Sequence, residues 1–239
     1  MVLITMAGLS SRFRKAGYDK PKYALLYKNR TIFEWAVCSF ERYFHSEPFL
    51  FIVRPDGFAR NFVQNSVQAL NIKNYSIFEL TDDTRGQAET AYKALQAYKV
   101  DFPVLIFNVD TIIHDYVKPV FIEECDGYLE VFEGEGEHWS FVKPGENLKV
   151  LETREKERIS NLCSDGLYYF RSQLDFKRIF EECLLNNEMV RGEYYIAPLY
   201  NKLIKEGKNV KYDMIDPHNI SFCGTPEEYE ALIRNGMPS

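Results

Sequence analysis

Short apolar runs punctuate the first half of the chain. Four of them have the length and the β-branched or aromatic content of buried strands. They are VLIT (2–5), FLFIV (49–53), YSIFEL (75–80) and PVLIFNV (103–109). Between them, apolar residues recur at helical spacing in the segments 31–44, 57–71 and 86–100, with Thr31 as a candidate N-cap for the first. Strands that alternate with helices predict a parallel sheet with right-handed crossovers.

The second half has a different pattern. Short strand-like runs separated by turn residues predict an antiparallel or mixed extension of the sheet. These runs cover 125–134, 138–145, 148–154 and 165–172. Helical spacing then follows at 174–186, 193–207 and 225–236. The sequence contains no repeat, low-complexity tract or linker, so we predict a single α/β domain over residues 1–239, with the second half forming a smaller lobe.

Composition narrows the possible functions. The 239 residues are 46% hydrophobic, which is enough for a sizeable core, and the formal net charge of −6 argues against a nucleic-acid-binding protein. No apolar run is long enough for a transmembrane helix, and we expect neither membrane association nor a secretory peptide. The five cysteines are scattered without a CxxC pair. That pattern indicates buried thiols in a reducing cytoplasm rather than disulfides or a zinc site.

The opening segment concentrates positive charge in this acidic chain. The small residues of Ala7–Ser11 follow the first strand, and five cations come within the next eleven positions: Arg12, Arg14, Lys15, Lys20 and Lys22. Small side chains let backbone N–H groups approach phosphate oxygens, and Arg and Lys neutralise them. The loop matches neither GxxxxGK[ST] nor GxGxxG. An ordinary strand-to-helix turn with solvated cations is the alternative.

Two further segments follow strand ends, where ligands of parallel sheets bind. Asp110, in NVDT, is a natural Mg²⁺ ligand, although Asp is also a common turn former. In TDDTRGQ, Gly86 would let a flat base approach and Gln87 could read its edge, unless Thr84 merely caps the helix. Glu155 and Lys156 lie in a run of alternating charges, which by itself indicates a solvated face.

The order of these motifs resembles that of the sugar-1-phosphate nucleotidylyltransferases, or NDP-sugar pyrophosphorylases. The resemblance rests on MAGLSSRF, KPK, TRGQAETA, NVDT, REK, SDGLYYF, RGEYYIAPLYNKLIKEG and GTPEEY, and covers residues 2 to 233. It implies a mostly parallel, Rossmann-like (GT-A-like) mixed sheet flanked by helices. Residues 1–115 would be the nucleotide-binding half and 116–239 the acceptor-binding half. The implied reaction joins a nucleoside triphosphate to a phosphorylated acceptor and releases pyrophosphate.

The resemblance also implies roles for individual residues. Arg12, Lys22 and Asp110 would be catalytic, and Asp110 would hold the Mg²⁺ cofactor. The nucleotide would be bound by Ala7, Gly8, Ser10, Ser11, Arg12, Thr84, Gly86, Gln87 and Asn108. The acceptor would be bound by Glu155, Lys156, Gly166, Arg191 and Glu193. This context reverses the interpretation of the Glu155–Lys156 pair as a solvated face.

Two departures from the family pattern matter. The opening is GLSSR rather than the commoner GxGTR, so Ser10 or Ser11 must supply what Gly and Thr usually give. Many members also place a second metal-binding Asp two residues before the glycine of the late GT segment, where this chain has Phe222. Asp216 is the nearest upstream carboxylate, and we consider it a candidate second ligand.

The sequence leaves the substrates open. The resemblance favours CTP, UTP or dTTP with a sugar-1-phosphate, and a cytoplasmic role in making precursors of capsule or other surface polysaccharide. A cytidylyltransferase with a non-sugar phosphate acceptor is one alternative. A GT-A-type glycosyltransferase is another, although it would need a DxD-like pair where NVDT has one carboxylate. A non-catalytic nucleotide-sensing domain is a third, and homo-oligomerisation is left open.

Overall fold

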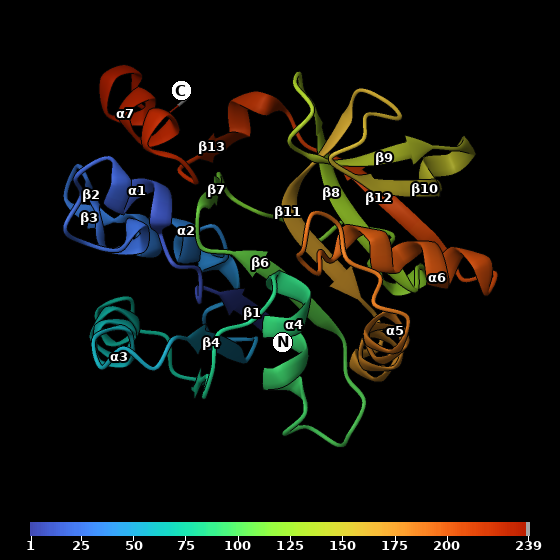
Figure 1. Ribbon diagram of the computed structural model, residues 1–239, viewed down its shortest axis with the longest axis horizontal. Helices are drawn as coiled ribbons and strands as arrows, with labels where there is room; N and C mark the ends of the chain where they lie inside the picture. Colours follow the sequence, from blue (N-terminus) through green and yellow to red (C-terminus); the bar gives the residue numbers. More distant parts are fainter. Residues whose placement is uncertain (238–239) are drawn as a thin grey trace. The chain divides into compact units, whose positions relative to one another are not determined.

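The computed structural model describes residues 1–237 of the chain (Figure 1). Its contacts divide the chain into two compact units made of interleaved segments. Unit 1 comprises Met1–Leu3, Asp83–Phe107 and Lys118–Ile215. Unit 2 comprises Ile4–Asp82, Asn108–Val117 and, among the described residues, 216–237. The assignment of nucleotide and acceptor roles to 1–115 and 116–239 stays a prediction.

In unit 2 the strands run in the order β1-β4-β5, and β4 and β5 are parallel; β1 and β4 are buried as predicted, whereas β5 is half-buried to exposed. Their bounds are Val2–Thr5 for β1, which both units share, Phe49–Val53 for β4 and Tyr75–Glu79 for β5. Helix α3 (Ala59–Ala69) packs on β4 and β5. These elements confirm the predicted alternation.

Helix α2 (Ile32–Cys38) begins where predicted but ends earlier. Thr31 caps it in a capping box with Glu34, which satisfies the free N–H groups of the first turn. The helix stops at Ser39, because the Ser39 hydroxyl and carbonyl accept hydrogen bonds from the backbone N–H groups of Ile113 and Tyr116. The tertiary partners therefore override the helical pattern that runs on to residue 44.

The other elements of unit 2 are short. They are α1 (Ser11–Lys15), η1 (Lys22–Ala24), β2 (Leu26–Tyr27), β3 (Arg30–Thr31), η2 (Glu41–Tyr43), β7 (Thr111–Ile113), η6 (Pro217–Asn219), β13 (Ile220–Phe222) and α7 (Pro226–Asn235). Strands of two or three residues have no detectable period, so the sequence did not predict β2, β3, β7 or β13. Strands β13 and β7 pair antiparallel and join the end of the chain to its middle.

One apolar cluster holds these short elements together. Phe13 on α1 is buried with residues from the β2–β3 hairpin, β7 and α7. The full set is Phe13, Leu25, Tyr27, Ile32, Ile112, Cys223, Tyr229 and Leu232. Burying a large side chain is worth about 1.5–3 kcal/mol. Phe13 therefore anchors a helix of five residues that could not persist alone.

In unit 1 the strand order is β10-β9-β11-β6-β1, with β8 paired to β11 and β12 paired to β8. The bounds are β6 (Val104–Asn108), β8 (Gly127–Glu133), β9 (Ser140–Pro144), β10 (Val150–Glu155), β11 (Leu162–Phe170) and β12 (Val210–Met214). β9, β6 and β8 run antiparallel to β11, whereas β12 runs parallel to β8. The structure thus confirms the predicted mixed sheet with an antiparallel lobe.

Helices flank this sheet. They are α4 (Gln87–Leu95), α5 (Gln173–Leu185) and α6 (Tyr200–Lys205), with the turns η3 (Ile122–Glu124), η4 (Glu146–Leu148) and η5 (Ala197–Leu199). Tyr92 on α4 and Phe180 on α5 lie with ring centroids 4.8 Å apart. The helix predicted over 193–207 starts only at η5, because Val190 and Glu193 pair as a β-bridge and Tyr194 hydrogen-bonds elsewhere.

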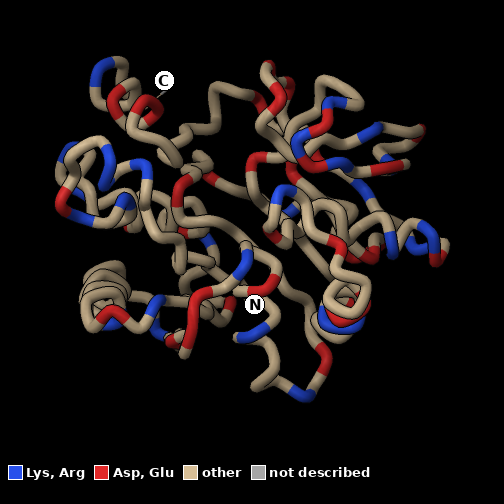
Figure 2. Tube along the Cα trace, in the orientation of Figure 1, with Lys and Arg blue, Asp and Glu red and all other residues tan. Residues whose placement is uncertain are grey.

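Charge and cysteine placement agree with the composition. Figure 2 shows cations and carboxylates interspersed along the chain. No helix among residues 1–237 is long and apolar enough to span a membrane. The described cysteines are free thiols: Cys38 is half-buried, and Cys125, Cys163, Cys183 and Cys223 are buried. Burial raises the pKa of Cys125 to about 11, so this thiol stays protonated at neutral pH.

Three carboxyl groups lie on neighbouring strands of unit 1. Glu130 on β8 and Asp165 on β11 are only 4% and 2% exposed, and Asp213 on β12 is the register partner of Glu130. Burial, together with the adjacent Asp165, raises the pKa of Glu130 well above its ordinary value. Burial also raises the pKa of Asp165 to about 7. The pair therefore keeps a proton in the folded state that the unfolded chain would release.

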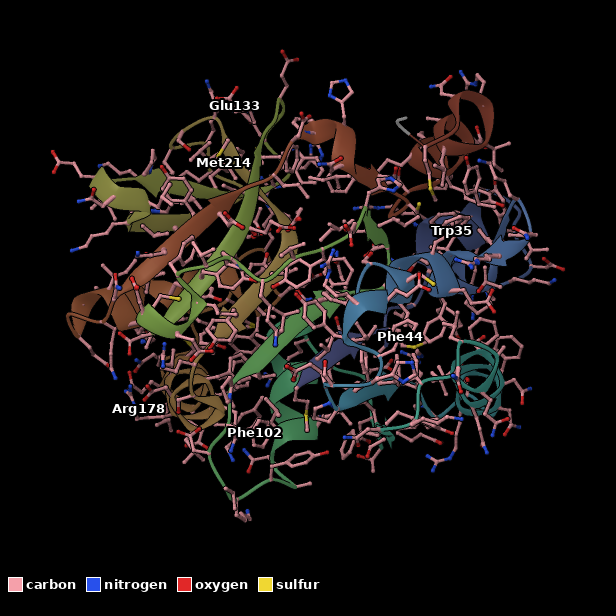
Figure 3. The ribbon with its side chains drawn as sticks, turned by 180° about the vertical axis from the view of Figure 1, so that it is seen from behind. Trp35, Phe44, Phe102, Glu133, Arg178 and Met214 are labelled. Atoms are coloured by element: carbon pink, nitrogen blue, oxygen red, sulfur yellow. The ribbon has the colours of Figure 1, made fainter. Side chains whose placement is uncertain are left out.

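This proton makes stability depend on pH. Because the folded-state pKa of Asp165 is raised, its stabilising effect is complete below about pH 4 and is lost as the pH rises through about 7. The raised pKa of Glu130 adds a loss of the same sign, so we expect Glu130→Gln, which cannot ionise, to remove the Glu130 part of this pH-dependent loss, roughly 2 kcal/mol, as measured by urea unfolding across that range. Glu133→Gln, at the exposed end of the same strand (Figure 3), is the matched control. Parallel pH profiles for Glu130→Gln and wild type would contradict the shared proton.

Candidate active site

The opening loop of unit 2 is exposed and has an unusual conformation. Ala7 and Gly8 follow β1, and the space around Gly8 is open. Ser10 adopts the left-handed conformation (φ 51°), and its carbonyl accepts a hydrogen bond from Arg14 N. Ser11 and the exposed Arg12 lie in the first turn of α1. The loop thus presents Arg12 to solvent from a backbone that Phe13 fixes.

Lys22 and Asp110 form the central contact of this unit. The Lys22 ammonium pairs with Asp110 Oδ2, and both side chains are less than one-fifth exposed. Lys22 N donates to Ser10 Oγ at 3.2 Å, so Ser10 also positions the lysine. Pro21 precedes Lys22 and starts the η1 turn. The structure therefore brings together three predicted residues that are far apart in the sequence.

The late GT segment encloses Asp110 from a second direction. Cys223 N donates to the Asp110 carbonyl at 2.8 Å. A Cβ atom on Gly224 would lie 2.9 Å from Asp110 Oδ2 and 3.4 Å from Glu228 Oε2. Glu228 Oε2 accepts hydrogen bonds from Gly224 N (2.8 Å) and Thr225 N (3.0 Å) in the capping box of α7. Gly224 is thus the residue that leaves room for the Asp110 carboxylate.

The residues around Asp110 fit a hard divalent cation. Asn108 Oδ1, two positions earlier, is buried and has no hydrogen-bond partner within residues 1–237. A carboxylate and an amide oxygen are ligands that Mg²⁺ accepts, and phosphate oxygens and water complete its octahedron. No group of three or more metal-binding side chains occurs in this part of the chain. A cation here would need oxygens from a substrate.

Asp216 and Phe222, the two positions considered for a second metal ligand, have other roles. The Asp216 side chain is 63% exposed and caps η6 by accepting a hydrogen bond from His218 N. Hydrogen bonds from His218 hold the pKa of Asp216 below its ordinary value. Phe222 ends β13 opposite Thr111, so an aromatic ring occupies the position where the family pattern has its second carboxylate.

The loop predicted to bind a base lies in unit 1. Gly86, not Thr84, is the N-cap of α4, so the helix-capping alternative for Thr84 is wrong. The Thr84 hydroxyl instead lies 2.6 Å from that of Thr90. Gln87 is the first residue of α4. Gly86 has φ +120°. The backbone of Tyr194 occupies the space that a side chain at position 86 would need, because a Cβ atom there would lie 2.4 Å from the Tyr194 carbonyl oxygen.

The predicted acceptor residues Glu155, Lys156, Gly166, Arg191 and Glu193 all lie in the same unit. Lys156 has a positive φ of 55°, and its ammonium hydrogen-bonds to Tyr195 Oη and lies 4.4 Å from the centroid of that ring. Glu155, only 8% exposed, accepts a hydrogen bond from Ser140 Oγ. Burial raises the pKa of Glu155, and the charges of Lys156, Glu193 and Arg191 also act on it.

Gly166 interrupts the long strand β11. It has φ +100°, and the pairing register with β8 shifts between Ser164 and Tyr168. Gly166 N donates to Ser164 Oγ at 3.2 Å. Such a bulge redirects the strand, and a left-handed backbone at its centre favours glycine.

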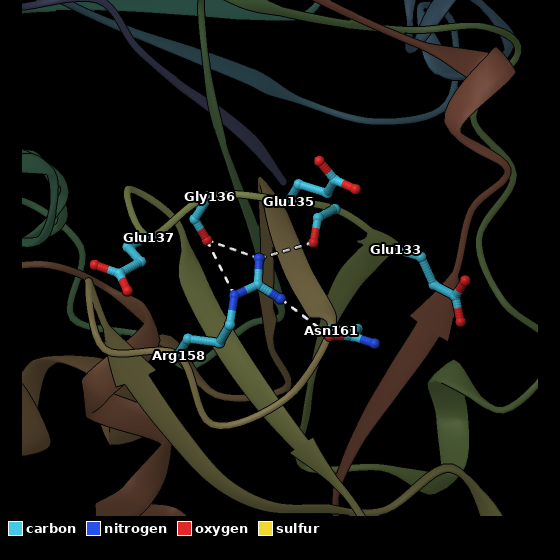
Figure 4. Close-up of a pocket in the computed structure, with 7 residues that line it drawn as sticks. Glu133, Glu135, Gly136, Glu137, Arg158 and Asn161 are labelled. Atoms are coloured by element: carbon cyan, nitrogen blue, oxygen red, sulfur yellow. Dashed lines mark hydrogen bonds between the residues drawn. The ribbon is translucent and has the colours of Figure 1, made fainter.

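A separate pocket of about 620 Å³ lies at the loop between β8 and β9 (Figure 4). It is lined by Glu133, Gly134, Glu135, Gly136, Glu137, Arg158 and Asn161, none of which was a predicted site residue. Arg158 donates to the carbonyls of Gly134 and Gly136 and to Asn161 Oδ1. These bonds hold the loop between β8 and β9, so Arg158 has a structural role here.

Several solved structures have a fold similar to that of this chain. The chain matches a nucleoside-diphosphate-sugar pyrophosphorylase from Vibrio cholerae RC9 with 46% identity and a TM-score of 0.93, covering 98% of this chain and 100% of that one. The chain belongs to the nucleoside-diphosphate-sugar pyrophosphorylase family. This membership confirms the resemblance inferred from the motifs and argues against a glycosyltransferase.

More distant pyrophosphorylase-like structures share the fold. An inositol-1-phosphate CTP transferase from T. maritima matches with 15% identity and a TM-score of 0.74, covering 100% of this chain and 97% of that one. The CTP:phosphocholine cytidylyltransferase LicC from Streptococcus pneumoniae matches with 13% identity and a TM-score of 0.73, covering 98% and 97%. No protein-family model and no curated protein matches the chain.

Sequence reasoning missed several partners of the pyrophosphorylase-family motifs. Ser140 and Tyr195 contact Glu155 and Lys156 from other strands or loops, and Gly224 restricts Asp110. The YY pair at 194–195 was visible in the sequence, but only the structure separates buried Tyr194 from half-buried Tyr195.

Gly86 allows a direct test of the packing against Tyr194. Gly86→Ala adds a positive-φ strain and a clash with the Tyr194 carbonyl, so we expect it to lower the unfolding free energy by about 2–4 kcal/mol. Gly192→Ala is the matched control, because Gly192 also has a positive φ (84°) but has open space around it. Its expected loss is about 1 kcal/mol. If urea unfolding showed the same loss of unfolding free energy for Gly86→Ala and Gly192→Ala, the close contact with Tyr194 would not contribute to stability.

Proposed function

We propose that this chain transfers a nucleotidyl group from a nucleoside triphosphate to a phosphorylated acceptor, with release of pyrophosphate. The observation that carries the proposal is the Lys22–Asp110 pair beside the exposed Ser10–Arg12 loop, in a chain of the pyrophosphorylase family. CTP, UTP and dTTP are the favoured nucleotides, and a sugar-1-phosphate is the favoured acceptor. A cytoplasmic role in making surface polysaccharide precursors is part of the same proposal.

The reaction requires charge neutralisation above all. An acceptor phosphate attacks the α-phosphorus while pyrophosphate leaves, so both partners are anions, and no side-chain nucleophile is needed. Arg12 can donate in a fork to phosphate oxygens, whereas the Lys22 ammonium can follow the leaving group as a point charge. Backbone N–H groups of the Ala7–Ser11 loop would orient the triphosphate.

Asp110 and Asn108 are the residues that would hold Mg²⁺. Held there, such a cation would supply positive charge to the phosphate groups of the substrates. Asp110 pairs with Lys22 in the structure, so the lysine is already placed beside the proposed metal position.

In unit 1, Thr84, Gly86 and Gln87 are proposed to contact the base. Lys156 would bind the acceptor phosphate, and Tyr195 orients it through its hydroxyl and ring. The charges of Lys156, Arg191 and Glu193 act on Glu155, and we propose that Glu155, Arg191 and Glu193 contact the polar groups of the acceptor. Gly166 would let the acceptor approach the backbone of β11.

Pyrophosphate release tests this function. CTP, UTP, dTTP, GTP and ATP are each supplied with Mg²⁺ and a panel of sugar-1-phosphates and small phosphate monoesters. We expect one pair to turn over, and Lys22→Ala or Asp110→Ala to lower kcat by about 10²–10³-fold, because each removes charge stabilisation of the transition state. A non-sugar monoester as the active acceptor would identify the cytidylyltransferase alternative.

Lys20→Ala is the matched control, since Lys20 is an exposed lysine two positions from Lys22. It should retain activity. Nucleotide binding without turnover across the panel would favour the sensing alternative, and absence of both would refute the proposal.

Gly224→Ala tests the proposed metal position. The new methyl group would meet the mobile end of Asp110, so the fold can adjust while the carboxylate moves. We expect the Mg²⁺ concentration for half-maximal activity to rise by about tenfold or more. The melting temperature, measured in parallel, should change by only about 3 °C. An unchanged Mg²⁺ requirement would show that Asp110 is not the ligand.

A further inference from the structure

Glu89 is a buried carboxylate to which none of the roles above assigns a function. It lies in the first turn of α4 and is 8% exposed. Its two oxygens accept three hydrogen bonds from Arg85: from the backbone N (2.6 Å), from Nε (3.2 Å) and from Nη2 (2.9 Å). Burial opposes its ionisation, but these bonds outweigh burial and hold the pKa of Glu89 below its ordinary value. The ionised Glu89 side chain therefore holds both the backbone and the guanidinium of Arg85 in place.

Arg85 in turn is attached to the segment 190–195. Its guanidinium lies 5.0 Å from the centroid of the Tyr194 ring. Its carbonyl accepts a hydrogen bond from Tyr194 N at 2.6 Å, and Ala88 N donates to the Tyr194 carbonyl at 3.1 Å. The close contact at Gly86 lies between these two bonds. Residues 85–88 cannot shift without moving the backbone of Tyr194.

Tyr194 also connects this loop to the residues proposed to bind the acceptor. It is 2% exposed, and its ring packs edge-on against Phe180 with centroids 5.4 Å apart. Its neighbour Tyr195 holds Lys156. The loop assigned to the base and the residues assigned to the acceptor phosphate therefore belong to one hydrogen-bonded element, with Glu89 at its buried end.

We propose that Glu89 is a positioning residue that couples the two substrates. A nucleotide base that orders residues 84–87 would also order residues 190–195 through Arg85 and Tyr194, so that bound nucleotide raises the affinity for the acceptor. Coupling between two sites is reciprocal and commonly amounts to a 5–150-fold change in affinity. The inference rests on the proposed function, because it takes the base and acceptor roles from there.

Amide hydrogen exchange tests the coupling without knowledge of the acceptor. The full chain is measured alone and with saturating CTP, UTP or dTTP and Mg²⁺, without acceptor. In the wild type we expect one nucleotide to slow exchange in both 84–90 and 190–196, by about fivefold or more in the second segment. In Glu89→Gln, saturating nucleotide should still protect 84–90 but leave 190–196 unchanged.

Glu182→Gln is the matched control. Glu182 pairs with Arg178 at the same i,i+4 spacing on α5, at 3.2 Å, and Arg178 is labelled in Figure 3. This variant should behave as the wild type. Arg85→Gln serves as a second variant if Glu89→Gln does not fold, since the Arg85 side chain is 53% exposed and its loss leaves no large cavity. It should give the same loss of protection in 190–196.

The outcomes separate the coupling from the function. Protection of 84–90 alone in the wild type, or equal protection of 190–196 in wild type and both variants, would overturn the coupling and leave the proposed function standing. No protection by any nucleotide would overturn both.

Discussion

The Lys22–Asp110 ion pair is the contact on which the proposed chemistry depends. It joins the opening loop to the strand end after β6, and a hydrogen bond from Cys223 N fixes the backbone of Asp110. An isolated pair at a surface contributes little, because water and salt screen it. This pair is partly buried, and the apolar cluster around Phe13 holds the elements on both sides of it. Apolar packing therefore fixes the positions of Lys22 and Asp110, and their ion pair forms within that fixed arrangement.

In unit 1, backbone hydrogen bonds rather than an ion pair join the segments that contain the predicted site residues. There, backbone hydrogen bonds between residues 85–88 and Tyr194 unite two segments, and glycine at position 86 is the condition for their approach. A lysine again lies beside a partner that limits its motion, since Tyr195 contacts Lys156 through both its hydroxyl and its ring. If Lys22 and Lys156 bind phosphate as proposed, these existing contacts would lower the conformational entropy that the lysines lose on binding.

The sequence predicted the elements whose pattern is long enough to have a period. The strands β1 and β4 and the capped start of α2 follow directly from the residues. The motifs also identified Lys22 and Asp110. Their convergence at the strand ends was also predicted, but the enclosure of Asp110 by Cys223 and Gly224 was not, because it follows the pairing of β7 with β13, strands of three residues each that lie far apart in the chain. Gly86 was predicted to admit a base, whereas its first constraint is the backbone of Tyr194.

The aromatic residue at position 222 has a consequence for how a metal would be held. Asp110 and Asn108 offer one carboxylate and one amide oxygen, so phosphate oxygens and water must supply the rest of an octahedral shell. We would expect such a position to bind a cation weakly in the absence of the proposed triphosphate substrate. Lys22 meanwhile neutralises Asp110, so the carboxylate is not left uncompensated in a partly buried place. Arrival of the triphosphate would give Lys22 a second anion to bind and free Asp110 for the cation, which makes metal binding and substrate binding a single event.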